Sequence, residues 1–255
     1  MSEVNGVVRK YGWRPELPDY RDKRYELRAL AGPLPAKVDL RPGCPKKVYD
    51  QGSLGSCTAN ALAAAHAFDQ IKQGLNPFDP SRLFIYFNER EMEGTINQDA
   101  GAYIRDGVKS LVNQGVCSES MWDYNISKFT VKPAQGCYDN AMTHQITAYL
   151  RLNPFLLDMK NCLAAGYPFT FGFSVYENFE TADVARTGMM PMPGGSMRGG
   201  HAVLCVGYDD SMGRMIVRNS WGPGWGDSGY FYMPYAFIAD SDNCDDMWTL
   251  RSVEG

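Results

Sequence analysis

Small and apolar residues dominate the chain from Cys57 to Phe68, which predicts a helix that is buried on nearly all of its faces. The run is rich in alanine and leucine, the residues with the highest helix propensity. Ser56 is a suitable N-cap for this helix and Gly74 a suitable C-terminal stop. The pattern therefore predicts a central helix whose first residue is a cysteine.

Apolar residues recur at helical spacing in three further segments. Asp79, with Pro80 after it, is expected to cap a second helix. A third helix is expected to start near Ile104 and to end at Gly115, and a short one to cover residues 156–165. Up to this point the chain is predicted to be mainly helical.

The period then changes to that of β-strands. Residues 169–175 alternate large and small side chains, and residues 201–208, 215–218 and 229–233 are predicted to form further antiparallel strands. Helices followed by strands indicate an α+β fold in one unit, residues 34–255, with a ligand cleft between two lobes. The expected parts are a helical lobe at about 46–150, a β lobe at about 151–234 and a C-terminal segment at 235–255.

Residues 1–33 form an extension rich in aromatic and charged residues, in which Pro15 and Pro18 disfavour a regular helix. One interpretation is a surface arm that packs along the body. The other is that Trp13 and its neighbours lie in or near the cleft and limit access to it, because so short a segment holds many anchoring aromatics. On the second interpretation, deletion of residues 1–33 raises the activity.

The composition is that of a globular protein, with 44% hydrophobic residues and no apolar run long enough to span a bilayer. The net charge of −4, without long blocks of one sign, disfavours nucleic acid and anionic membranes as partners. Residues 1–10 lack the layout of a secretory signal. We therefore expect a soluble monomer that stays in the cytoplasm, has lost a leader or is exported without one.

Seven cysteines are present, an odd number, so they cannot all pair with one another. With Cys57 free, the other six permit up to three disulfides in an oxidising compartment. Cys162 and Cys205 lie in apolar runs and are expected to be buried free thiols. No pair has the spacing of zinc ligands, so no metal site is predicted.

Cys57 is the candidate nucleophile, because the N–H groups and dipole of a helix N-terminus favour a thiolate. It needs a base, and the sequence has three histidines. His66 lies nine residues along the same helix, about 13 Å away, and is expected to pack in the core or at the interface of the lobes. His144 is expected to be a solvated helix residue. His201 starts a strand after a glycine-rich turn and is the candidate base.

Three further side chains complete the predicted site. Asn219 can accept a hydrogen bond from the imidazole of His201 and fix its tautomer, and Trp221 can shield this bond from water. The side-chain amide of Gln51 can join the backbone N–H of Cys57 in binding the oxyanion of a tetrahedral intermediate.

The segments 51–57, 200–203 and 219–226 resemble the three sequence blocks of papain-like cysteine peptidases. They read Gln-Gly-Ser-Leu-Gly-Ser-Cys, Gly-His-Ala-Val and Asn-Ser-Trp-Gly-Pro-Gly-Trp-Gly. The histidine and the asparagine lie 144 and 162 residues after the cysteine (201 − 57 and 219 − 57), close to the interval of that family. The arm around Trp13 is similar to that of bacterial members such as xylellain. The resemblance implies a papain-like two-lobed fold with an antiparallel, β-barrel-like second lobe.

By this resemblance the chain is a cysteine peptidase, and an endopeptidase, that passes through a thioester acyl-enzyme. Cys57 is then the nucleophile, His201 the acid/base, Asn219 the residue that orients it and Gln51 the oxyanion donor. No cofactor is implied beyond a reduced thiol, and the expected partners are peptide or protein substrates and protein inhibitors.

The resemblance also implies how a substrate binds. Gly101 and Ala102 take the place of the family's glycine pair, whose backbone holds an extended peptide. Small residues of the second lobe are expected to wall a roomy apolar pocket for the side chain two before the scissile bond. The expected binding residues are Gly101, Ala102, Gly172, Gly199, Gly200, Ala202 and Trp221.

Three features depart from the family pattern. Leu54 stands where relatives usually have a cysteine, so the disulfide that braces this loop in secreted relatives cannot form. Thr58 replaces an aromatic residue, so part of the cleft wall on the leaving-group side is expected to be lost. The long helical propeptide of many relatives is missing, and the short arm stands in its place.

Two other functions stay open at this point. Another Cys-His acyl transferase or hydrolase, such as a transglutaminase or a peptidoglycan peptidase, has the same nucleophile and base, but commonly orients its histidine with an aspartate. A catalytically silent peptide-binding module would keep the cleft and react slowly with thiol reagents. Product analysis and titration of the thiol distinguish the three functions.

Overall fold

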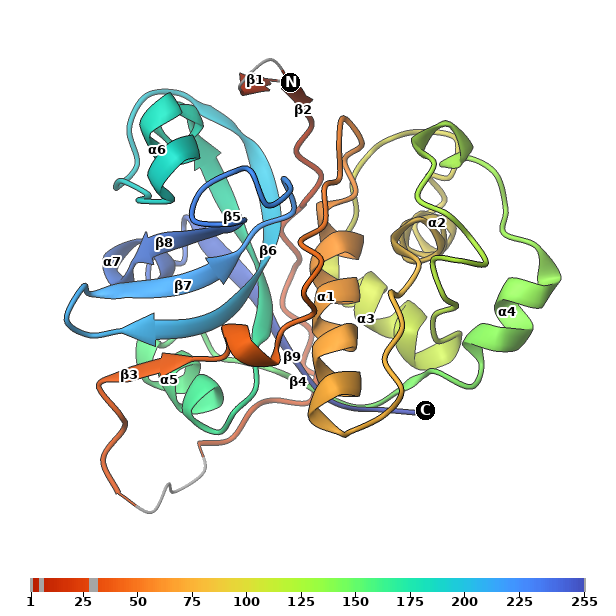
Figure 1. The fold of residues 1–255 in the computed structure, drawn as a ribbon, viewed down its shortest axis with the longest axis horizontal. Helices are drawn as coiled ribbons and strands as arrows, with labels where there is room; N and C mark the ends of the chain where they lie inside the picture. The colour runs from red at the N-terminus through yellow and green to blue at the C-terminus, as the bar shows by residue number, and fades with distance from the viewer. Residues whose placement is uncertain (1, 5–6, 28–31, 255) are drawn as a thin grey trace.

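The computed structural model describes residues 2–4, 7–27 and 32–254. A helical lobe and a lobe built on a β-sheet lie side by side, and residues 7–27, called the arm below, run between them (Figure 1). At the start of the arm, β2 (Val7–Arg9) pairs with β1 (Ser2–Val4). The α+β class predicted from the sequence is confirmed.

The helical lobe is organised around α1 (Cys57–Lys72), which is buried along most of its length. The small side chains of α1 allow other elements to approach it closely on several sides. In the helical lobe, α2 (Arg82–Met92) and α3 (Ile104–Asn113) pack on α1. Strands of the sheet pack on α1 from the side of the β lobe. α4 (Gln135–Ala141) completes the lobe.

The second helix begins two residues later than predicted. Its N-cap is Ser81, whose side chain accepts a hydrogen bond from the N–H of Phe84. The predicted cap at Asp79 and first helical position at Pro80 are therefore wrong. Pro80 instead forms a β-bridge with Ser118, which leaves the next serine to satisfy the helix terminus.

The main sheet is antiparallel, with strand order β4-β9-β5-β6-β7-β8 and β3 added beside β6. In the part of the chain that the structure describes, the two ends of this path do not pair, so the sheet is open and the expected barrel-like closure is absent. The strands are β3 Lys37–Asp39, β4 Ile146–Arg151, β5 Phe169–Tyr176, β6 Met197–Asp209, β7 Arg214–Arg218, β8 Tyr230–Pro234 and β9 Cys244–Val253.

The short β3 and the longer strands β4 and β9 have no counterpart among the predicted strands. β4 lies in the stretch expected to end the helical lobe, and β9 lies in the expected C-terminal segment. They pair with each other, and β9 also pairs with β5 in the middle of the sheet. The sheet is therefore built from segments far apart in the sequence, and the lobes are not two consecutive stretches of chain.

Shorter elements cover the sheet and connect the lobes. α5 packs on β5 and β6. The shorter elements are η1 Arg41–Gly43, η2 Ile126–Lys128, α5 Leu156–Ala164, η3 Glu177–Glu180, α6 Ala182–Thr187 and α7 Tyr235–Ile238.

One hydrophobic core surrounds α1 and a second fills the β lobe. All seven cysteines are buried free thiols, as expected for Cys162 and Cys205. Leu54, at the position where a cysteine was expected by resemblance, is buried in the first core. Apolar packing, not a disulfide, therefore braces the loop before α1.

Candidate active site

Cys57 is the first residue of α1 and lies where this helix meets β6. Ser56 occupies the N-cap position as predicted, but its hydroxyl bonds the hydroxyl of Tyr124 at 2.5 Å and does not cap the helix. The first N–H groups of α1 therefore remain available. One of them, the N–H of Thr58, bonds the sulfur of Cys57.

The sulfur of Cys57 is fully buried, and burial raises its pKa to about 11. Bonds from the N–H groups of Ala202, Gly12 and Thr58 lower this pKa, because they stabilise a thiolate. Ala202 belongs to β6, whereas Gly12 belongs to the arm. In this structure the cysteine is thus a thiol at neutral pH, because the cost of burial exceeds the effect of the helix N-terminus.

His201 lies on β6, directly before the residue whose N–H bonds the sulfur. Its Nε2 lies 2.8 Å from Oδ1 of Asn219, which follows β7. The same oxygen accepts the N–H of Ser220 at 2.8 Å, so the carboxamide is held in place. The other ring nitrogen, Nδ1, is buried and has no hydrogen-bond partner among the described residues. One nitrogen is therefore oriented by Asn219 and the other is left for another partner.

Aromatic rings enclose the imidazole of His201. Trp221 stacks on it with centroids 5.0 Å apart, and Phe173 and Tyr11 present their edges at 5.7 and 6.0 Å. Burial lowers the pKa of His201 to about 4, the bond to Asn219 raises it and the cation of Arg9 lowers it. The ring is neutral at pH 7, and the stacking of Trp221 on it is compatible with the predicted shielding of its bond to Asn219.

Gln51 is held beside residues 219–221 by two hydrogen bonds with Ser220. Its N–H donates to the carbonyl of Ser220 at 2.9 Å, and its Oε1 accepts the hydroxyl of Ser220 at 2.8 Å. These bonds direct Nε2 away from Ser220, toward the carbonyl oxygens of Leu54 at 3.0 Å and Lys10 at 3.2 Å. Lys10 is part of the arm, so an arm carbonyl is bound to the amide predicted to bind an oxyanion.

The arm also bridges the two predicted walls of the cleft. The N–H of Ala102 donates to the carbonyl of Gly12 at 2.7 Å, and the carbonyl of Ala102 accepts the N–H of Arg14 at 3.3 Å. From the other wall, the carbonyl of Gly200 accepts the N–H of Trp13 at 2.9 Å. The arm thus uses backbone groups of both lobes in the way that an extended peptide does.

The remaining predicted binding residues also lie against the arm or at Cys57. A methyl group on Gly101 would overlap the carbonyl of Gly12, one on Gly199 would crowd Tyr11, and one on Gly172 would overlap the indole of Trp13. Ala202 directs its N–H to the sulfur of Cys57 and so lies at the nucleophile. The structure therefore brings all the predicted site residues to one groove, which the arm fills.

Sequence reasoning missed the acidic residues that hold the arm. Basic, tyrosine and tryptophan side chains of the arm pair with them along its length, and Asp22 of the arm pairs in turn with Arg105. The alternation of basic and aromatic residues in the arm was the only signal available. The pairs are Arg9–Asp50, Lys10–Asp99, Tyr11–Glu180, Trp13–Asp246 and Arg14–Glu93.

Thr58, which replaces an aromatic residue of the family, points away from the groove. Its hydroxyl donates to Oε2 of Glu89 on α2 at 2.8 Å, and both side chains are fully buried. Burial raises the pKa of Glu89 to about 8, and the bond from Thr58 lowers it. This departure from the family thus serves the packing of α1 on α2.

The other two histidines lie away from Cys57, near the C-terminal end of α1. His66 is fully buried, with Nδ1 2.8 Å from the amide of Gln70 and Nε2 3.1 Å from the carbonyl of His144, so its predicted core role is confirmed. His144 follows α4 in a bend and packs on Phe78 with ring centroids 4.6 Å apart. The expected helix position of His144 is therefore wrong, and its side chain is half-buried.

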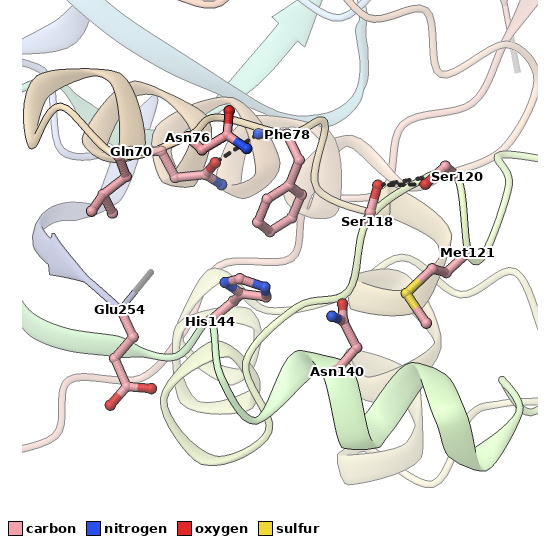
Figure 2. Close-up of a pocket in the computed structure, with 10 residues that line it drawn as sticks. Gln70, Asn76, Phe78, Ser118, Ser120, Met121, Asn140, His144 and Glu254 are labelled. Carbon is pink, nitrogen blue, oxygen red and sulfur yellow. Dashed lines mark hydrogen bonds between the residues drawn. The ribbon is translucent and has the colours of Figure 1, made fainter.

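His144 lines a hollow of about 350 Å³ on the helical lobe, together with Phe78, Asn140 and Glu254 (Figure 2). Figure 2 shows Phe78, His144 and Asn140 turned toward a common space, with Ser118 and Ser120 bonded to each other at its edge. The residues that line the hollow include no cysteine. None of the predicted site residues lines it, so it is separate from the groove.

Among residues 2–4, 7–27 and 32–254, no three histidine, cysteine or acidic side chains converge on a point where they could ligate a metal ion. The same residues contain no helix with the length and apolar character needed to cross a bilayer.

The sequence model described as papain family cysteine protease matches residues 34–245. An uncharacterized peptidase C1-like protein of Acanthamoeba polyphaga mimivirus is 40% identical over 98% of this chain and 89% of its own length. Pro-cathepsin H of Bos taurus is 31% identical over 88% of this chain and 67% of its own length. The crystal structure of xylellain, a cysteine protease from Xylella fastidiosa, superposes with a TM-score of 0.90 at 43% identity, covering 100% of this chain and 99% of the other.

Proposed function

The chain belongs to the papain family of cysteine proteases and is a peptidase, and we propose that it cleaves peptide bonds with Cys57 as nucleophile and His201 as acid and base. Asn219 orients the imidazole, and Gln51 together with the N–H of Cys57 binds the oxyanion. The observation that carries this proposal is the pairing of His201 with Asn219 at 2.8 Å beside the N–H that bonds the sulfur of Cys57.

The reaction follows from these positions once the groove is open. Nδ1 of His201, which has no other described partner, takes the proton of the Cys57 thiol. The thiolate attacks the peptide carbonyl carbon, and the negative oxygen is bound by Nε2 of Gln51. The C–N bond breaks as His201 gives its proton to the departing amine, leaving a thioester. Water, deprotonated by His201, then releases the carboxylic acid and the free thiol.

The arm is proposed to hold the full chain in an inactive state. Its Lys10 carbonyl occupies Gln51, its Tyr11 ring covers His201, and its backbone takes the hydrogen bonds of both walls. At Gly12 the arm presents an N–H to the sulfur, whereas attack requires a carbonyl carbon at about 3–3.5 Å. The arm therefore blocks the groove and is not itself cut at this position.

Endopeptidase action is supported by the course of the arm. The chain continues on both sides of Gly12 through the groove, from Arg9 at one end to Arg14 at the other. A groove that holds the interior of one extended chain can hold the interior of another. We therefore propose that the enzyme cuts within peptides and does not require a free terminus.

Matched variants test the proposal. Cys57→Ala and His201→Ala are expected to lower kcat/KM on a fluorogenic peptide by at least about 10³-fold while the protein stays folded, as its circular dichroism would show. Cys137→Ala and His144→Ala, which remove the same side chains from the helical lobe, should leave the rate within about twofold. Cleavage in water enriched in ¹⁸O should place the label in the new carboxyl group, as hydrolysis requires. Full activity of Cys57→Ala would refute the mechanism.

A further inference from the structure

The arginine of the arm at one end of the groove is held by a carboxylate and an aromatic ring. Arg9 pairs with Asp50 at 2.7 Å, and its guanidinium carbon lies 5.4 Å from the centroid of the Trp221 ring. The side chain of Arg9 is 6% exposed, so the groove encloses this cation. A guanidinium group binds well to carboxylates and to the faces of aromatic rings, so both contacts favour arginine.

A second arginine of the arm is held in the same way at the other end. Arg14 pairs with Glu93, and its guanidinium carbon lies 4.2 Å from the centroid of the Tyr103 ring. The two arginines are five positions apart, and Gly12, whose N–H bonds the sulfur of Cys57, lies between them. The groove therefore has a guanidinium site on each side of the nucleophile.

Contacts within the body of the protein hold both sites together. Asp50 forms a β-bridge with Trp221, and its Oδ1 accepts the N–H of Gly52 at 2.9 Å. At the other end, Oε1 of Glu93 accepts the N–H of Tyr103 at 2.9 Å. None of these contacts involves the arm. The carboxylate and the ring of each site are therefore expected to stay side by side when the arm leaves.

The departure of the arm leaves both carboxylates without a cation. Among the described residues, Asp50 and Glu93 form ion pairs with the arm alone. Arg82 donates to the backbone carbonyl of Asp50 at 3.0 Å, but its charge is already paired with Glu119 at 2.7 Å. Because a free carboxylate and an aromatic face both attract cations, the open groove favours a chain that brings a guanidinium to each end.

We propose that the open groove selects polypeptides with arginine on both sides of the scissile bond, one bound at Asp50 and Trp221 and the other at Glu93 and Tyr103. This inference rests on the proposed peptidase function and names its substrate class, arginine-rich polypeptides. Lysine brings the charge but not the planar group that lies on a ring, so it is expected to bind less well. A spacing of five positions is the same in both chain directions, so a substrate that runs opposite to the arm can also reach both sites.

The test uses the full chain and internally quenched peptides that contain a span of six residues. The two outer positions of the span hold arginine, lysine or citrulline, and the inner positions hold an equal mixture of neutral residues. Citrulline has nearly the shape of arginine but carries no charge. Ratios of kcat/KM are compared, because the fraction of molecules with the arm displaced scales all the rates equally.

The ratios should depend on salt. At about 10 mM salt, the peptide with two arginines is expected to exceed the one with two citrullines at least about tenfold, with the lysine peptide between them. At about 1 M salt, the ratio should fall to about twofold or less, because the Debye length shortens to about 3 Å.

Variants of the two carboxylates distinguish the two sites. Asp50→Asn and Glu93→Gln each remove one charge and keep an oxygen for the backbone N–H that it accepts. With peptides that hold one arginine and one citrulline, Asp50→Asn should abolish the preference for arginine at one end of the span and Glu93→Gln at the other. The double variant should cleave the arginine and citrulline peptides at about the same rate. Asp123→Asn, which removes an exposed carboxylate paired with Lys128, is the matched control and should keep the full preference.

Equal rates for the arginine and citrulline peptides at low salt would overturn the two guanidinium sites, while cleavage that depends on Cys57 would leave the peptidase function standing. A preference for arginine that survives in the double variant would overturn them too. If a variant does not fold, a ratio on the unaltered chain that stays constant between low and high salt still overturns them. In Gly12→Ala, the added methyl group would overlap the carbonyl of Gly55 and so displace the arm. If neither this variant nor the unaltered chain cleaved any peptide, the proposed function and this inference would both fail.

Discussion

Nε2 of Gln51 donates a hydrogen bond to the carbonyl oxygen of Lys10 at 3.2 Å, so the arm supplies to this amide the kind of oxygen that a substrate would bring. The bonds from Ser220 hold Gln51 in this orientation. A donor that is fixed before the reaction stabilises developing charge without reorganisation. If Gln51 binds the oxyanion as proposed, the Lys10 carbonyl must leave before the oxyanion can form.

Gln51→Glu replaces this N–H donor by a carboxylate of nearly the same size. We expect kcat to fall about 10²–10³-fold with a smaller change in KM, because the lost bond acts mainly in the transition state. Gln135→Glu, an exposed change at the start of α4, is the matched control and should leave kcat unaltered. A folded Gln51→Glu enzyme with the kcat of the unaltered chain would show that the oxyanion is bound elsewhere.

Gly12→Ala should activate the full chain. A methyl group at this position would overlap the backbone carbonyl of Gly55, which cannot move aside as a side chain can, so the arm must shift. We expect the initial rate on a small peptide to rise about tenfold, the effect of about 1.4 kcal/mol of lost docking energy. Leu17→Ala changes an arm residue that is 86% exposed and should leave the rate unaltered. Equal rates for all three proteins would mean that the arm does not limit access.

Deletion of residues 1–33 removes a core residue together with the part of the arm that fills the groove. Tyr25 is 2% exposed, packs in the core of the β lobe and donates to Oδ1 of Asn161 at 2.5 Å. Its backbone N–H also bonds the carbonyl of Arg151. Removal of this residue opens a core, so a loss of activity in the deletion variant would report on folding and not on the arm.

The docking of the arm in the groove should depend on pH. With the arm docked, burial raises the pKa of the Cys57 thiol from 9.0 to about 11, so if undocking solvates the sulfur, raising the pH above about 9 favours an open groove. Burial also lowers the pKa of His201 from 6.5 to about 4, so if undocking solvates the ring, lowering the pH below about 6.5 favours an open groove as well. Docking is therefore expected to be tightest between these limits.

Ultraviolet absorbance of the thiolate, taken as the difference between the unaltered chain and Cys57→Ala, measures this effect. The difference should be absent at pH 7 in the unaltered chain and should appear only as the pH approaches about 11. In Gly12→Ala it should appear at lower pH, because the sulfur becomes solvated and gains an imidazolium partner. A thiolate signal at pH 7 in the unaltered chain would contradict the state described for Cys57.

Glu89 should make the stability depend on pH. Its pKa is raised from 4.5 to about 8 by burial, so the folded protein holds a proton that the unfolded chain releases above about 4.5. The stability from this group is complete at low pH and is lost as the pH rises through about 8. The thermal midpoint of Glu89→Gln relative to the unaltered chain should therefore increase between pH 5 and pH 9. Parallel melting curves over this range would show that Glu89 is ionised in the fold.

Local patterns in the sequence determined the central helix and the chemistry around it. The alanine-rich run after Cys57 predicted α1, and the alternation at residues 169–175 predicted β5. The histidine and asparagine of the candidate site were found because they occur in segments with an unusual combination of glycine, polar and aromatic residues. These features depend on neighbours in the chain, so a short window of sequence contains them.

Tertiary structure alone decided how the groove is filled and what lies at its end. Strand β9 meets β4 and β5 only through pairing between distant segments, and no local period marks it. The bulge at Asp246 and the docking of Trp13 both depend on that pairing. The state of Cys57 also depends on the folded structure: the helix N-terminus favours a thiolate, but burial keeps the proton on the sulfur. The sequence gives the ionisable side chains. Their burial and their partners, which set their charge, exist only once the chain has folded.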